Sequence, residues 1–176
     1  MRYSEKYTPP TKEVESENWN GKEYKEDWIS MTMPRDGFKV IYDKDFTMFM
    51  APEKDNSEFV ITRMHRFNRE KMNKNGKNFL RKRIDKGLTD IKLLEESETV
   101  ENGYRWYYVI VGTDKNGVQR VSMNVVFEDS ARKKLFQISV HGKFGNMPIV
   151  ASDFNYIVEN FKTEPRKVKK DLQLQD

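Results

Sequence analysis

The residues that stand out for chemistry in this sequence are basic side chains crowded into the segment 63–86. Ten cationic residues share that segment with Glu70 and Asp85, which leaves a net charge of +8. They are Arg63, Arg66, Arg69, Lys71, Lys74, Lys77, Arg81, Lys82, Arg83 and Lys86. Such a density is typical of surfaces that bind phosphate, nucleic acid or anionic lipid. Phe67 and Phe79 lie among these residues, as stacking side chains do in nucleic-acid sites.

Two other interpretations of this basic segment remain open. It can be a solvated loop and helix face, since a charge run on an amphipathic element is polar wherever it faces water. It can also be a patch for an acidic protein partner. The rest of the predicted domain has a net charge of −3, whereas nucleic-acid-binding domains are usually basic and carry a recognisable motif. We therefore rank nucleic acid below a protein as the partner.

The two histidines are the next candidates, as metal ligands or catalytic bases. His65 and His141 have no His or Cys neighbour at ligand spacing, so the sequence predicts no metal site. No serine lies in the sequence context of a known nucleophile motif. We interpret both histidines as surface residues at strand ends.

Carboxylates gather before the Asn102-Gly103 pair, at Glu95, Glu96, Glu98 and Glu101. A cation or an acid–base pair would suit them, but the stretch is too polar to bury one of them. An exposed edge strand that carries charge to discourage aggregation explains them better.

The run Asp114–Gly117 is similar to the start of a calcium loop. The glutamate expected at the twelfth loop position is absent, since Val125 stands there. We therefore interpret this run as a turn.

The absence of cysteine excludes disulfides, thiol catalysis and cysteine-ligated metal sites. The chain also has no Gly-rich phosphate loop, no G-x-G-x-x-G and no H-E-x-x-H motif. The sequence therefore predicts no cofactor, no metal and no catalytic residues, and we expect a protein that is not an enzyme.

Aromatic side chains form the last candidate, a surface made by Trp106, Tyr107 and Tyr108. Phe127 and Phe136 belong to the same cluster, so rings occupy both faces of the predicted sheet. The face away from the helix can be a partner groove or can be buried. We favour burial.

These groups are positioned by a predicted antiparallel meander. Asn-Gly at 102–103 and at 116–117 separates apolar runs, and this pair is the strongest short hairpin signal. Apolar residues then alternate along each run, as in half-buried strands. The predicted strands are Ile91–Val100, Tyr104–Gly112, Val118–Phe127 and Leu135–His141.

Shorter strands precede the meander, and two helices complete the fold. The strands are predicted at Ile29–Met33, Phe38–Ile41, Thr47–Met50 and Glu58–His65. The helices are Lys77–Lys86, closed by Gly87 as a C-terminal cap, and Pro148–Phe161, with a 3.6-residue apolar period. The order predicts an α+β sandwich, in which an antiparallel sheet is flanked by two helices.

Polarity at both ends divides the chain. Residues 1–27 and 163–176 hold few apolar side chains, whereas 28–162 has the composition of an ordinary folded domain. We expect a polar N-terminal tail or linker, a single α+β domain at 28–162 and a charged C-terminal tail. No run approaches the ~18 apolar residues that a membrane helix needs.

The whole order resembles the PsbP-like (Mog/PsbP) superfamily, over roughly residues 35–162. The stretch Gly37–Phe46 is similar to the family's opening motif G-[FY]-x-[IV]-x-Y-P-x-[DG]-[FW], with Asp43 where the family often has proline. The aromatic strand Gly103–Tyr108 and the closing helix that ends at Phe161 are further similarities.

This resemblance implies an accessory, assembly or partner-binding role and no set of catalytic residues. Relatives include photosystem accessory subunits, a Ran-GTPase-binding transport factor, secretion-system effector chaperones and bacterial lipoproteins. We expect a non-enzymatic accessory protein with a protein partner. Membrane contact would come only through a removed lipid anchor at the N-terminal tail. The location would be the cell envelope or periplasm if the precursor has a signal, and otherwise the cytoplasm. The alternative is an anion- or nucleic-acid-binding protein that uses 63–86.

Overall fold

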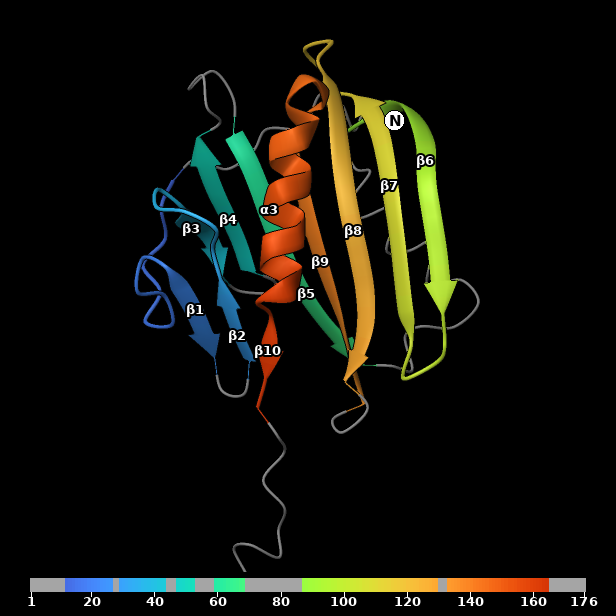
Figure 1. Ribbon diagram of the computed structural model, residues 1–176. Coiled ribbons are helices and arrows are strands. Elements are labelled where there is room, and N and C mark those ends of the chain that lie inside the picture. The colour runs from blue at the N-terminus through green and yellow to red at the C-terminus, as the bar shows by residue number, and fades with distance from the viewer. Residues whose placement is uncertain are drawn as a thin grey trace, which may run out of the picture.

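Two antiparallel sheets and a long helix make up the part of the chain that the structure describes. The computed structural model describes residues 12–26, 29–43, 47–52, 59–68, 87–129 and 133–164. The large sheet has seven strands in the order β3-β4-β5-β9-β8-β7-β6, and the small sheet has the order β1-β2-β10. The helix α3 crosses the front of the large sheet (Figure 1).

The bounds of the elements follow the predicted strands and the second predicted helix closely. The large sheet contains β3 (Lys39–Asp43), β4 (Thr47–Pro52), β5 (Phe59–Asn68), β6 (Thr89–Thr99), β7 (Arg105–Thr113), β8 (Gln119–Asp129) and β9 (Lys134–Lys143). The small sheet contains β1 (Glu23–Glu26), β2 (Ile29–Thr32) and β10 (Lys162–Thr163). A short 3-10 turn, η2 (Phe144–Asn146), leads into α3 (Met147–Glu159).

The antiparallel meander is confirmed, since β6, β7, β8 and β9 pair with their neighbours in chain order. Asn102 has a φ of 58° and Gly103 a φ of 102°, the left-handed conformations that a tight hairpin turn requires at both positions. β3, β4 and β5 extend the large sheet beyond β9, with which β5 pairs. The α+β fold class is therefore confirmed.

One face of the large sheet, which we call the helix face, packs against α3 and the small sheet. Val150, Phe154 and Ile157 of α3 are buried in this core. Tyr24 of β1 meets Phe49 of β4 edge-on, with ring centroids 5.7 Å apart. Because apolar side chains recur every second residue on β7, β8 and β9, the centre of the large sheet presents a continuous apolar layer here.

An ion pair fixes α3 to the loop that follows β2. Arg35 Nη1 lies 2.5 Å from Asp153 Oδ1, and the Asp153 side chain is buried. Burial raises the pKa of Asp153, and the neighbouring Arg35 guanidinium offsets this only in part. Arg35 also lies over the Phe38 ring, 5.0 Å from its centroid.

The opposite side of the sheet, which we call the second face, has its own buried cluster. Trp106, Tyr108 and Ile110 of β7 pack there with Val126 of β8 and Leu135 of β9. The alternation predicted for β7 is therefore confirmed, and both faces of the central strands are buried.

Three predicted features fall partly or wholly outside the described residues. The helix Lys77–Lys86 is one, although Gly87 has a φ of 98°, the left-handed conformation that a cap glycine adopts. Residues 1–11 and 165–176 of the expected tails are the others. Within the expected N-terminal tail, Glu23–Glu26 forms β1 and pairs with β2. The division into one domain and two tails stays a prediction.

Candidate functional site

The basic segment begins within β5, where Arg63 and Arg66 pair through the backbone with Ser139 and Phe136 of β9. Phe67 also lies in β5, opposite Leu135. The other eight basic residues and Phe79 lie outside the described residues. The binding patch at 63–86 therefore stays a prediction.

The two histidines do not share a site, and the prediction that His141 lies on the surface is wrong. His141 is 7% exposed, because it lies inside β9 on the second face, opposite Ile61 of β5. His65 pairs with Gln137, which lies four residues before His141 on β9, so the two histidines are about 13 Å apart along the strand. Within the described ranges, no group of three or more His, Asp or Glu residues is placed to hold a metal ion.

Buried polar side chains accompany His141 on the second face, a feature that the alternation did not predict. His141 lies opposite Ser122, and Asn124 Nδ2 donates a hydrogen bond of 3.1 Å to Ser122 Oγ. Gln137 Nε2 donates to Tyr108 Oη at 3.0 Å. A catalytic pair must reach a substrate, whereas Ser122 is 2% exposed. One of these hydrogen bonds lies within β8 and the other links β9 to β7 across β8, and we assign this polar row no chemistry.

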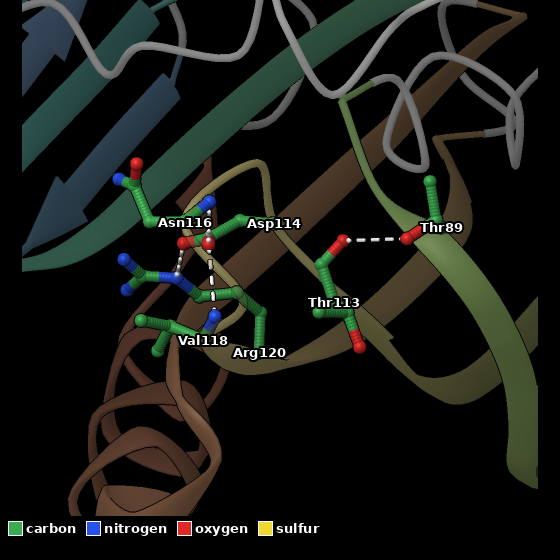
Figure 2. A network of polar contacts seen from close by, with 6 residues as sticks. All are labelled: Thr89, Thr113, Asp114, Asn116, Val118 and Arg120. Atoms are coloured by element: carbon green, nitrogen blue, oxygen red, sulfur yellow. Dashed lines mark hydrogen bonds and ion pairs between the residues drawn. The ribbon is translucent and has the colours of Figure 1, made fainter.

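Asp114 closes the β7–β8 hairpin, which confirms its interpretation as a turn (Figure 2). Its Oδ1 accepts hydrogen bonds from the backbone N–H of Asn116 at 2.8 Å and of Val118 at 3.0 Å. Its Oδ2 accepts one from Arg120 Nε at 3.0 Å. Burial alone raises the pKa of Asp114, but these hydrogen bonds outweigh burial and hold the pKa below its usual range. The carboxylate is engaged in the turn rather than presented to a cation.

The predicted aromatic surface is not exposed, which corrects the candidate site at Trp106, Tyr107 and Tyr108. Trp106 and Tyr108 are both 0% exposed, and their rings stack with centroids 4.3 Å apart on the second face. Tyr107 is half-buried on the helix face, 5.9 Å from the Phe154 ring. Burial, the alternative that we favoured, holds because both faces of β7 are covered.

The edge strand β6 is exposed along its whole length. Every residue from Thr89 to Thr99 is exposed, and β6 pairs only with β7 in the seven-stranded order. Four apolar side chains face solvent here: Ile91, Leu93 and Leu94 in β6, and Val100 just beyond it. The prediction of an exposed, charged edge strand is confirmed, and the apolar side chains make it more than a repulsive edge.

Three carboxylates of β6 hold aromatic side chains that lie on or beside β7. Glu96 Oε2 accepts a hydrogen bond of 2.7 Å from Trp106 Nε1. Glu98 accepts one from the Tyr104 hydroxyl, and Glu95 accepts one from the Tyr107 hydroxyl. Glu95 thereby binds a side chain of the helix face, whereas Glu96 and Glu98 bind side chains of the second face. These hydrogen bonds tie β6 to β7 on both sides of the sheet.

These contacts predict an unusual alkaline titration. Burial, reinforced by Glu98, raises the pKa of Tyr104 far above its ordinary value of 10.0. A raised folded pKa means that the stabilising contribution is fully present below pH 10 and is lost as the pH rises through the folded pKa. We expect ultraviolet difference spectra to show that Tyr104 stays protonated until the chain unfolds in alkali.

Substitutions assign that titration to a residue. Tyr104→Phe should remove one late-titrating group from the spectrum. Glu98→Gln should bring the ionisation of Tyr104 closer to its ordinary range, whereas Glu101→Gln, at an exposed position beyond β6, should change nothing. A Glu98→Gln profile identical to that of the unchanged chain would contradict the assignment.

Comparison with known proteins places the fold but not the family. No family model matches the chain, and no curated protein matches its sequence. Two solved structures share its architecture at 12% sequence identity. PA94 of Pseudomonas aeruginosa, a protein of unknown function, has a TM-score of 0.52, with 78% of this chain and 99% of PA94 covered. LpqN of Mycobacterium tuberculosis, which is involved in cell envelope biogenesis, has a TM-score of 0.51, with 78% of this chain and 84% of LpqN covered.

The fold is shared with both. At this identity the likeness extends to the fold alone. In the described ranges, no helix has both the length and the apolar content to span a membrane.

Proposed function

We propose that this chain is a non-enzymatic accessory protein that binds a protein partner through β6. The observation that carries the proposal is the edge itself, an eleven-residue strand exposed along its whole length with apolar side chains among its carboxylates. Soluble proteins usually shorten, cover or charge such edges, because unpaired N–H and C=O groups recruit other strands. An edge that keeps exposed leucines is typical of an interaction site.

Two further points support an accessory role at the cell envelope. The PsbP-like resemblance of residues 35–162 implies partner binding rather than catalysis, and LpqN, which shares the fold, takes part in cell envelope biogenesis. We propose that the polar N-terminal segment tethers the domain there. The anion-binding alternative rests on the net charge of +8 at 63–86.

The partner-binding proposal is testable by crosslinking in the native cells. A photoreactive amino acid at Leu94, which is 51% exposed on β6, should yield a discrete protein adduct. The same group at Ser152, exposed on α3, serves as the matched control and should not yield that adduct. Circular dichroism of both purified variants verifies that they fold.

Three outcomes decide between the proposals. A protein adduct from position 94 alone supports partner binding through β6. A nucleic-acid adduct would favour the anion-binding alternative instead. No adduct at 94, or the same adducts at both positions, would refute the proposed role of β6.

A further inference from the structure

The edge strand β6 has an uninterrupted stretch that is long enough to receive another strand. Its register with β7 runs without shift from Glu95 to Thr99, opposite Val109 to Arg105. Both register shifts lie earlier, between Thr89 and Lys92 and between Leu93 and Glu95. Bulges hinder pairing where they occur, so strand addition is confined to the regular half, which is about 17 Å long.

The charge of this edge selects the chemistry of the incoming strand. The stretch 89–101 contains five carboxylates and one lysine, a net charge of −4. Glu95, Glu96 and Glu98 each accept a hydrogen bond from an aromatic side chain. An ionised carboxylate has about four acceptor positions, so Glu95 and Glu96 each retain capacity for a cation from a partner.

Apolar side chains lie at both ends of the regular stretch. Leu94 precedes it and Val100, which is 76% exposed, follows it. An extended partner that covers both would bury apolar area in addition to forming main-chain hydrogen bonds.

A second copy of this chain is a poor occupant for the same edge. In an antiparallel pair of β6 strands with the two-fold axis at Ser97, Glu96 of each copy would lie opposite Glu98 of the other. With the axis at Glu96, that residue would oppose itself. Like charges directly opposite across a strand pair are destabilising. Pairing between two β6 strands is therefore disfavoured, whereas pairing with a cationic strand is favoured.

We propose that β6 binds an extended, basic segment of a partner protein by strand addition along Glu95–Thr99. Lysine or arginine side chains of that segment meet Glu95 and Glu96 on the two faces of β6, and its apolar side chains cover Leu94 and Val100. This inference rests on the proposed partner-binding function and adds the chemistry of the partner.

A synthetic peptide of about nine residues, in which pairs of lysines alternate with pairs of valines, tests the inference, since it presents lysine on both faces of the strand and spans Leu94–Val100. Fluorescence anisotropy should show that the full chain binds it at least about tenfold more tightly than a glutamate–valine peptide of equal length, and more weakly at high salt. Amide hydrogen exchange should slow at Glu95–Thr99 when the peptide is bound.

Leu94→Lys should weaken peptide binding about tenfold, because it removes apolar area and repels the lysines. Val14→Lys is the matched control, since Val14 is 37% exposed and lies against β3 at the other edge of the sheet. It should leave binding unchanged.

Equal affinity for both peptides, or an equal effect of the two variants, would overturn the inference. So would a dimer in sedimentation analysis that Leu94→Lys disperses, since the occupant would then be a second copy. If the peptide does not bind but the protein adduct at position 94 is observed, the inference of a basic strand is wrong and the proposed partner-binding function stands. If the peptide binds but no adduct forms in cells, the affinity of β6 for a basic strand is supported and the proposed partner-binding function is refuted.

Discussion

Replacing Trp106 by alanine is expected to lower the free energy of unfolding by about 4 kcal/mol, the largest effect of any single substitution that we predict. Trp106 is 0% exposed, stacks on Tyr108 and donates a hydrogen bond to Glu96. Alanine would leave a large cavity in the smaller of the two buried clusters, where few neighbours can move to fill it. Denaturant unfolding followed by far-ultraviolet circular dichroism measures the change.

Trp106→Phe is the matched control, because it keeps an aromatic ring in the cluster and removes the pyrrole part of the indole with its N–H. We expect it to cost less than half as much, since the exposed Glu96 carboxylate regains water when its donor is lost. If Trp106→Ala cost less than about 1 kcal/mol, the second face would not be a buried core.

Replacing Asp114 by alanine is expected to cost about 3 kcal/mol, although the residue lies in a hairpin turn. The substitution removes the acceptor of two backbone N–H groups and the ion partner of Arg120, whose side chain is only 9% exposed. Asn116→Ala is the control, because Asn116 contributes its backbone N–H to the network and its side chain is exposed. It should change stability by no more than about 0.5 kcal/mol.

The pH dependence of the Asp114 effect separates charge from shape. The folded pKa of Asp114 lies below its ordinary value of 3.8, so its contribution is fully present above that pH and is lost as the pH falls through the folded pKa. The stability difference between the unchanged chain and Asp114→Asn should therefore shrink in acid. A difference that stays constant from neutral pH into this acid range would assign the effect to shape alone.

Sequence and structure agree most closely where the determining interactions are local. Alternation along β7 and β8 predicted which side chains share a face, and Asn102-Gly103 predicted a hairpin that both residues close with positive φ. These signals succeed because side chains point to opposite faces every second residue, and because few residues adopt that turn conformation.

For the histidine and aromatic candidates, the observed environment differs from the predicted surface site, because the burial of these side chains depends on distant segments of the chain. His141 looked like a strand-end residue, but β9 continues to Lys143 and is central in the sheet, between β5 and β8. Trp106 and Tyr108 are likewise buried, since β7 is covered on both faces. Neither strand order nor face coverage is encoded in the spacing of a single strand.

By itself, the sequence determined the α+β class, the antiparallel meander, the acidic character of 89–101 and the absence of cysteine chemistry. The sequence also predicted β6 as an exposed, charged edge strand, but only the tertiary structure decided that its carboxylates hold aromatic side chains of β7 and that its leucines are left in solvent. The physical reason is that a residue's type and spacing act within a few positions, whereas exposure of an edge depends on which strands pair across the whole chain.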